Sequence, residues 1–323
     1  MLHTHEVNNR IDADFPPALF LMGPTASGKT ALAVRLAQQF NAEIISVDSA
    51  LVFRGMDIGT AKPTTVERAG ILHHLIDILD PTESFSTGAF RQHALALMAD
   101  ITARGKLPLL VGGTMLYFNA LFYGLAKLPT ADAVLREQLA TEALKIGKVA
   151  MHAQLQQIDP VAAARIHPND PQRVQRALEV YRLTGKPITQ LHAEAKADVL
   201  PYRQIKLIVV PRDRAVLHEK IALRFQQMLQ QGLVAEVDAL YRRGDLTADM
   251  PAIRAVGYRQ VWSYLAGEIS AELMQVQGVA ATRQLAKRQL TWLRKETEVE
   301  RFFTDEGEVF ANVMAYVQQQ ISL

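Results

Sequence analysis

The stretch LFLMGPTASGKTALAVRL, from Leu19 to Leu36, runs from an apolar segment through a glycine-flanked loop into helix-forming residues. Within it, Gly23, Gly28, Lys29 and Thr30 match the pattern G-x-x-x-x-G-K-[ST]. In this pattern the backbone N–H groups of a loop and the positive end of the following helix bind phosphate oxygens. The stretch therefore predicts a strand, a phosphate-binding loop and a helix, in that order.

The loop also predicts how the phosphates are held. We expect Lys29 to reach the terminal phosphate and the Thr30 hydroxyl to hold Mg²⁺. The pattern recognises a diphosphate or a triphosphate, and its backbone amides do not require a nucleoside. The residues expected to contact the phosphates are Gly23, Pro24, Thr25, Ala26, Ser27, Gly28, Lys29 and Thr30.

Composition limits the class of protein. The chain has 323 residues, 49% of them hydrophobic, which favours two domains. It lacks cysteine, which excludes disulfides, thiolate nucleophiles and cysteine-ligated zinc. No apolar run long enough for a membrane span and no signal-peptide pattern is present, so we expect a cytoplasmic protein.

The first seventeen residues are expected to form a flexible extension. His3 and His5 lie in it and could bind a stray metal ion, although a frayed terminus explains them as well. Residues 1–17 are therefore left outside the predicted catalytic core.

The first 120 residues alternate between strand and helix patterns, which is typical of a parallel sheet with helices on both faces. Helices are expected at 28–39 and 88–104. The expected strands are 18–22, 43–47, 74–78 and 107–111.

Residues 127–202 differ from the rest because they are helical in period, rich in Ala, Gln, Leu and Arg, and interrupted by prolines. The apolar segment within 203–213 then predicts a return to the sheet, followed by helical residues 215–293 and a short closing strand and helix. We therefore predict an α/β fold like that of P-loop NTPases, a mostly parallel sheet flanked by helices. Its catalytic core is 18–126 with 203–323, and 127–202 is an inserted all-helical domain.

Asp48 directly follows the second predicted strand, in ISVDSALV. The carboxyl ends of parallel strands form the edge where open α/β folds bind ligands, so Asp48 should lie beside the phosphate loop. A carboxylate at this place could bind Mg²⁺, accept a proton from a nucleophile, or cap the next helix.

The strand LPLLV leads into GGTMLYF, so Gly112, Gly113 and Thr114 follow it without any carboxylate. A nucleotide kinase would be expected to carry a metal-binding acid at such a strand end. The two glycines allow a close backbone approach and Thr114 offers a hydroxyl, although a plain turn would also fit.

Basic residues gather in ATRQLAKRQLTWLRK, where Arg283, Lys287 and Arg294 share one helical face and Trp292 adds a flat apolar surface. The chain carries a formal charge of only +2, so such local clusters must supply any nucleic-acid surface. Two further basic stretches are NDPQRVQRALEVYR and PAIRAVGYRQVW. Although charged runs are often only solvated faces, three of them favour a polyanion bound by both domains.

Seven motifs in this order resemble those of the bacterial tRNA dimethylallyltransferases, also called tRNA isopentenyltransferases. They are GPTASGKT, ISVDSALV, GMDIGTAKP, LLVGGTMLY, DPQRVQRALEVY, IRAVGYRQVW and AKRQLTWLRK, and the match extends from about Leu19 to Lys295. The resemblance implies Mg²⁺-dependent transfer of a dimethylallyl group from dimethylallyl diphosphate to N6 of the adenosine 3′ of the anticodon, adenosine 37. It implies tRNAs that read UNN codons and release of diphosphate.

The resemblance also implies roles for individual residues. Asp48 would be the general base, Arg224 would neutralise the diphosphate with Lys29, and Thr114 would contact the target nucleotide or the phosphates. Arg136 would be a further tRNA contact at the start of the insertion. The remaining residues implied to line the tRNA surface are Asp48, Ser49, Ala50, Leu51, Gln172, Arg173, Val174, Gln175, Arg176, Arg254, Ala255, Val256, Gly257, Tyr258, Arg259, Lys287, Arg288, Gln289, Leu290, Thr291, Trp292, Leu293 and Arg294.

Two other classes of function fit parts of the sequence. A small-molecule kinase would explain the phosphate loop but predicts a second metal-binding acid. A non-catalytic RNA-binding module would explain the basic stretches but gives Asp48 no task. A monomer that binds an anticodon stem–loop, with no membrane partner, is the expectation.

Overall fold

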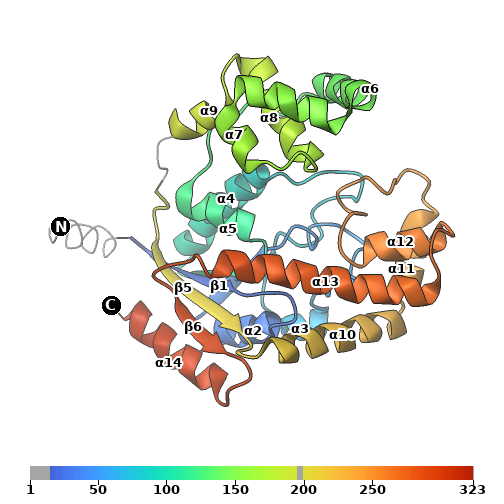
Figure 1. Cartoon of the computed structure of the whole chain (residues 1–323). Coiled ribbons are helices and arrows are strands. Elements are labelled where there is room, and N and C mark those ends of the chain that lie inside the picture. Colours follow the sequence, from blue (N-terminus) through green and yellow to red (C-terminus); the bar gives the residue numbers. More distant parts are fainter. Residues whose placement is uncertain (1–14, 195–198, 323) are drawn as a thin grey trace. The chain divides into compact units, whose positions relative to one another are not determined.

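The computed structural model describes residues 15–194 and 199–322. Their contacts divide them into two compact units (Figure 1). The first unit contains the described residues up to Leu121 and those from Pro201 onward, and the second is Phe122–Leu200. Most of the predicted extension 1–17, including His3 and His5, lies outside the described residues.

The first unit is built on a six-stranded sheet with the order β3-β2-β4-β1-β5-β6. Every pair of neighbouring strands is parallel, which confirms the predicted α/β class. The strands are β1 (Pro17–Met22), β2 (Ala42–Val47), β3 (His73–His74), β4 (Leu107–Gly112), β5 (Arg203–Val210) and β6 (Glu300–Phe303).

Helices cover both faces of this sheet (Figure 1). Alternate strand residues such as Leu19, Leu21 and Leu109 pack with helices α2 and α14 in one apolar cluster. Phe20, on the opposite face, meets Phe118 of α5 edge to face. The helices with residues in the first unit are α2 (Lys29–Gln39), α3 (Thr65–Arg68), α4 (Thr87–Ala103), α5 (Met115–Tyr123), α10 (Arg214–Gln230), α11 (Leu233–Tyr241), α12 (Tyr258–Leu265), α13 (Ala271–Leu293) and α14 (Val309–Ile321). No helix in the described ranges is both long enough and apolar enough to cross a membrane.

One predicted strand was wrong in extent, and one predicted helical region contains several helices. The strand expected at 74–78 ends at His74, because Leu75 and Asp77 adopt positive φ and the chain turns to pair with the backbone of Leu51 and Val52. The helical region 215–293 is divided into α10 to α13. Gly232, with φ 104°, interrupts it between the first two of these helices.

The second unit has only helices among its described elements: α6 (Ala133–Ile158), α7 (Pro160–Arg165), α8 (Pro171–Thr184) and α9 (Ile188–Glu194), besides the end of α5. Its own core contains Leu139, Leu155 and Leu178. Asp170 caps α8 by accepting a hydrogen bond from the Arg173 N–H, and Pro171 occupies the first turn, as DPQR predicts.

Candidate active site at the carboxyl edge of the sheet

The phosphate-loop pattern lies between β1 and α2, as the sequence predicts. Gly28 precedes α2 in the left-handed region, with φ 84°. Gly23 packs against the end of β5, since a Cβ at this position would lie 2.3 Å from the Val209 carbonyl oxygen. The two glycines thus permit a loop that lies against the sheet edge with its helix directly behind it.

Lys29 turns back onto its own loop. Its ammonium donates to the Pro24 carbonyl oxygen at 2.6 Å and lies 3.4 Å from the Ser27 hydroxyl. The pKa of this ammonium is lowered to about 7, chiefly by burial and secondly by Arg224, whereas Asp48 acts in the opposite direction. An anion bound in the loop would favour the protonated form.

Asp48 occupies the end of β2, as predicted. One carboxylate oxygen, Oδ1, accepts hydrogen bonds from the N–H groups of Ala50 at 2.8 Å and Leu51 at 3.3 Å. The alternative that Asp48 caps the next helix is wrong, because α3 begins only at Thr65, with Thr64 as its cap; the carboxylate instead holds the turn after β2. Its charge also acts on Lys29 and Arg224, and it contributes with burial to raising the pKa of Tyr117 to about 12.

Arg224 reaches this edge from α10, distant in sequence from the loop. Its guanidinium forms no hydrogen bond or ion pair with the described residues. Burial lowers its pKa, and the charges of Asp48 and Glu67 oppose the effect. The three charged groups singled out for the reaction, Lys29, Asp48 and Arg224, therefore interact electrostatically at one edge of the sheet.

Thr114 joins the ends of two strands. Its N–H donates to the Val47 carbonyl oxygen, and its hydroxyl oxygen accepts from the Ser49 N–H, both at 3.2 Å. A Cβ at Gly112 would lie 2.0 Å from the Val47 carbonyl oxygen, so glycine is required where β4 passes β2. The segment after LPLLV thus places Thr114 beside Asp48.

Gln289 has a contact that the sequence did not predict. Its side-chain oxygen accepts from the Thr25 N–H at 2.9 Å, and its amide nitrogen donates to the Gly113 carbonyl oxygen at 3.0 Å. Helix α13 is thereby fixed to the phosphate loop and to the turn after β4. A residue expected to contact tRNA links the two loops of the site.

In the second unit, Arg136 and Arg176 bind one buried carboxylate. Glu179 accepts from Arg136 Nε at 2.9 Å and from Arg176 Nη1 at 2.7 Å. Burial opposes ionisation of Glu179, yet these hydrogen bonds hold its pKa below the usual value. The i,i+3 spacing of Arg176 and Glu179 was a local signal for this pair, whereas Arg136 comes from another helix.

Four residues expected along the tRNA surface are buried. They are Val174, Gly257, Tyr258 and Leu293. The side chains of Val174, Tyr258 and Leu293 are thus turned away from solvent, and Gly257 has none, so a tRNA contact at these four positions stays a prediction. Their burial does, however, fix exposed neighbours such as Arg173, Arg259 and Arg294.

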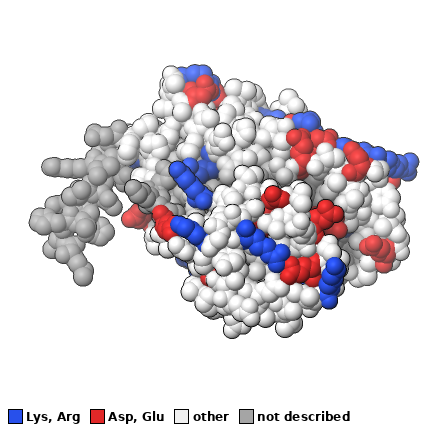
Figure 2. Space-filling view, turned by 90° about the horizontal axis from the view of Figure 1, so that it is seen from above, with Lys and Arg blue, Asp and Glu red and all other residues white. Residues whose placement is uncertain are grey.

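The basic residues of α13 are exposed, and so is Arg294 directly after this helix. Arg283, Lys287, Arg288 and Arg294 all face solvent, and Trp292 is 39% exposed. On the face shown in Figure 2, basic and acidic side chains are interleaved, in keeping with the small net charge. On this face the basic side chains form short groups and no continuous patch.

A magnesium ion would find few protein ligands at this edge. The described residues contain no group of three His, Cys, Asp or Glu side chains that could hold a metal ion. Thr30 is exposed in the first turn of α2. A hydroxyl beside a phosphate loop suits Mg²⁺, which takes most of its ligands from water and phosphate oxygens.

Comparison with known proteins agrees with these features. The family model for IPP transferase matches residues 51–296, and the model for isopentenyl transferase matches 17–78. A tRNA dimethylallyltransferase of Methylococcus capsulatus is 60% identical over 286 residues, which is 88% of this chain and 92% of that protein. One from Thioalkalivibrio sulfidiphilus is 58% identical over 306 residues, 94% of this chain and 96% of that protein.

Solved structures give the same result. The tRNA isopentenylpyrophosphate transferase of Bacillus halodurans is 39% identical, with a TM-score of 0.70, over 95% of this chain and 97% of that one. A eukaryotic dimethylallyltransferase captured acting on tRNA is 27% identical, with a TM-score of 0.82, over 95% of this chain and 80% of that one. With this fold, this edge and these relatives, the chain belongs to the tRNA dimethylallyltransferase family, enzymes that transfer an isopentenyl group to tRNA.

Proposed function

We propose that this enzyme transfers a dimethylallyl group from dimethylallyl diphosphate to N6 of adenosine 37, 3′ of the anticodon, in tRNAs that read UNN codons. The observation that carries the proposal is the meeting of Lys29, Asp48 and Arg224 at the carboxyl edge of the sheet. Two cations and one carboxylate are what a leaving diphosphate and a weak amine nucleophile need.

The proposed step is a single displacement. The adenine N6 forms a bond to C1 of the dimethylallyl group while the bond from C1 to the diphosphate oxygen breaks. Asp48 takes the proton that N6 loses, and diphosphate leaves with the electron pair of the broken bond. Because negative charge grows on the diphosphate, the loop amides, Lys29 and Arg224 stabilise the transition state more than the bound substrate.

Lys29 has a second feature that suits this role. A desolvated ammonium whose pKa is about 7 gains most from a nearby anion, and its present partners are only a carbonyl and a hydroxyl. Asp48 keeps one carboxylate oxygen outside the local hydrogen bonds to Ala50 and Leu51. We assign this second oxygen, Oδ2, as the atom that accepts the proton from N6.

Magnesium belongs to the same proposal. The Thr30 hydroxyl and the diphosphate oxygens would hold the ion, which would supply further positive charge to the leaving group.

Thr114 would contact the target nucleotide, since its hydroxyl lies beside Ser49 at the same edge. The exposed residues of Arg254–Arg259, Lys287–Arg294 and Gln172–Arg176 would bind the anticodon stem–loop of tRNA, with the enzyme acting as a monomer.

The adenine has to leave its stack to reach a carbon at the sheet edge. Unstacking a base costs a few kcal/mol, and the cost is smaller in a single-stranded loop than in a duplex. Exposed groups such as Trp292 offer flat surfaces for the splayed bases.

The test is the mass of the product. The enzyme is incubated with Mg²⁺, dimethylallyl diphosphate and anticodon stem–loops that differ only at the position 3′ of the anticodon or in the base that reads the first codon position. The proposal expects one added C5H8 unit on the adenine 3′ of the anticodon, and none when that adenine is replaced. Modification at another nucleotide, or ATP consumption in place of the prenyl donor, would contradict it.

A further inference from the structure

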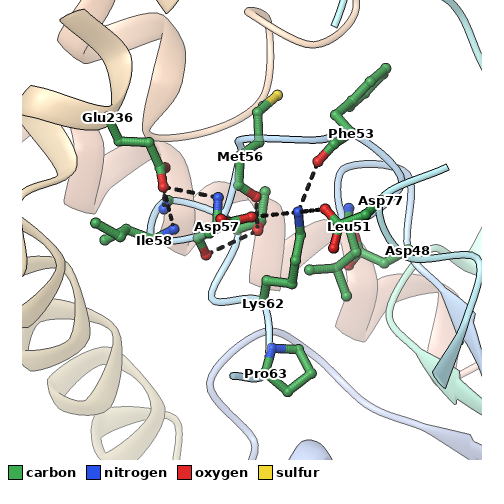
Figure 3. A network of polar contacts seen from close by, with 12 residues as sticks. Asp48, Leu51, Phe53, Met56, Asp57, Ile58, Lys62, Pro63, Asp77 and Glu236 are labelled. Atoms are coloured by element: carbon green, nitrogen blue, oxygen red, sulfur yellow. Dashed lines mark hydrogen bonds and ion pairs between the residues drawn. The ribbon is translucent and has the colours of Figure 1, made fainter. Parts of the chain in front are cut away.

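The segment GMDIGTAKP, Gly55–Pro63, has no role in the reaction as described so far, yet it is fixed by an unusual carboxylate. Glu236 of α11 accepts the N–H groups of three successive residues (Figure 3). Its Oε2 accepts from Asp57 at 2.9 Å and from Ile58 at 2.7 Å, and its Oε1 accepts from Gly59 at 3.1 Å. Hydrogen bonds to a charged acceptor are stronger than neutral ones, so this turn is firmly held.

The same carboxylate also binds the start of α12. The Tyr258 hydroxyl donates to Glu236 Oε1, and Tyr258 is fully buried. The tyrosine ring packs directly on the turn, since a Cβ at Gly59 would lie 2.5 Å from its Cε2. Arg254 and Arg259, on either side of Tyr258 in the sequence, are exposed.

Lys62 continues the network from the other end of the turn. Its ammonium donates to the Phe53 carbonyl oxygen at 2.8 Å, to Asp57 Oδ1 at 2.6 Å and to Asp77 Oδ1. Its side chain is only 3% exposed, and all three of its donors have acceptors. Asp57 therefore links the contacts of Glu236 to those of Lys62, because its N–H donates to Glu236 and its carboxylate accepts from Lys62.

From Asp77 the contacts reach the site itself. The Asp77 N–H donates to the Leu51 carbonyl oxygen at 3.2 Å, and the Leu51 N–H donates to Asp48 Oδ1 at 3.3 Å. Figure 3 shows Lys62 and Asp77 beside Leu51 and Asp48. A continuous series of polar contacts thus joins Tyr258, next to an exposed arginine, to the carboxylate at the sheet edge.

We propose that Glu236 and Lys62 are positioning residues that hold Asp48 in register with the RNA-facing segment Arg254–Arg259. This inference rests on the proposed role of Asp48 and on tRNA as the substrate. A base turned out of an RNA loop is delivered by contacts made elsewhere on the RNA. The acceptor carboxylate must therefore keep a fixed place relative to those contacts.

The variants Glu236→Gln and Lys62→Met test it. Glutamine keeps the size of the side chain but removes the charge and points an amide at backbone donors, and methionine removes the three donors of Lys62. The measurements are kcat, KM for unmodified tRNA, KM for dimethylallyl diphosphate, Kd for the anticodon stem–loop without donor, and the thermal midpoint. We expect kcat to fall and KM for tRNA to rise about tenfold each, with KM for the donor within about twofold.

Glu43→Gln is the matched control. Glu43 is also a buried carboxylate with several partners, but it lies at the opposite end of β2 from Asp48. We expect it to lower the thermal midpoint while both KM values and kcat stay unchanged. If Glu236→Gln and Lys62→Met behave in the same way as Glu43→Gln, the two residues serve stability alone and the inference fails.

Tyr258→Phe keeps the inference testable if either variant does not fold. It removes one hydroxyl, leaves the ring on Gly59, and should raise the Kd for the stem–loop about threefold without changing the thermal midpoint by more than a few degrees. An unchanged Kd would overturn the inference. Failure of the wild-type enzyme to modify adenine would contradict the proposed function instead, and the Kd measurements would still decide the positioning role.

Discussion

The two ends of strand β2 carry carboxylates with opposite surroundings. Glu43, near the amino end, is 2% exposed and accepts hydrogen bonds from Arg104, Lys106 and His74. Asp48, just past the carboxyl end, accepts only the backbone N–H groups of Ala50 and Leu51 among the described residues. One strand therefore presents a saturated carboxylate at one end and an open one at the other.

The cations differ in the same way. Arg104 donates to Glu43 and Asp100, and its charge is fully compensated. At the other end Lys29 and Arg224 are desolvated without an ion pair among the described residues, and burial lowers the pKa of each. Charges that the protein leaves uncompensated are available to a ligand, whereas the saturated cluster can contribute only to stability.

The strongest test of this difference is Asp48→Asn. Asparagine keeps an acceptor for the N–H groups of Ala50 and Leu51 but cannot take the proton from N6. We expect kcat to fall by about 10²- to 10⁴-fold, with the free energy of unfolding almost unchanged. Single-turnover prenylation of the stem–loop and urea denaturation of the same preparation measure the two quantities. A variant that retained wild-type kcat would remove Asp48 from the proton transfer.

The converse is expected at the other end of the strand. Glu43→Gln should lower the free energy of unfolding by about 2–3 kcal/mol, because the cationic side chains of Arg104 and Lys106 lose a buried charged acceptor, while kcat stays at the wild-type value. Arg104 first, with Lys106 and His74, holds the pKa of Glu43 well below its usual range.

The pH dependence of this effect has a definite sign. A carboxylate with a depressed pKa in the folded state stabilises the protein above its unfolded pKa of about 4.3, and the stabilisation is lost as the pH falls below that value. The difference between wild type and Glu43→Gln should therefore shrink between pH 5 and pH 3, to be measured by urea denaturation at each pH. A difference that grew in acid would rule out this account.

Sequence patterns predicted the phosphate loop, Asp48 and the strands of the sheet because each depends on residues close together in the chain. They missed the roles of Glu236, Lys62 and Gln289, since each side chain binds backbone or carboxylate groups from another segment. Gln289, for example, binds Thr25, 264 positions away. They also did not show that Tyr258 is buried, because an aromatic residue between two arginines gives no local sign of the turn that buries it.

The protonation of Lys29 is a measurable property of the open, carboxyl end of β2. With a pKa of about 7, most of this ammonium is deprotonated at pH 8 in the free enzyme, and a bound diphosphate should restore the proton. Calorimetry of inorganic diphosphate binding at pH 8, in buffers of different ionisation enthalpy, should show uptake of close to one proton and about tenfold weaker binding than at pH 6.

The control for that measurement is Lys29→Met. Diphosphate itself changes protonation on binding, and this part is common to wild type and variant, so the difference between them isolates the lysine. Equal proton uptake by the two proteins would contradict the assignment of the titrating group.

The smallest expected effect concerns the contact between α13 and the open edge. Gln289→Ala leaves the Thr25 N–H and the Gly113 carbonyl oxygen without their side-chain partner. Only the hydrogen bond to the Thr25 N–H holds the phosphate loop, and one net hydrogen bond contributes about 1 kcal/mol, so KM for dimethylallyl diphosphate should rise about fivefold. Steady-state kinetics with the donor varied at saturating tRNA measures this change. Thr282→Ala on the same helix is the control, because its hydroxyl donates only to the Gly278 carbonyl oxygen among the described residues and it lies outside the proposed tRNA-binding segments. If Gln289→Ala instead raised KM for tRNA and left KM for the donor unchanged, Gln289 would act as an RNA contact. Its hydrogen bonds to Thr25 and Gly113 would then have no part in holding the diphosphate at the open end of β2.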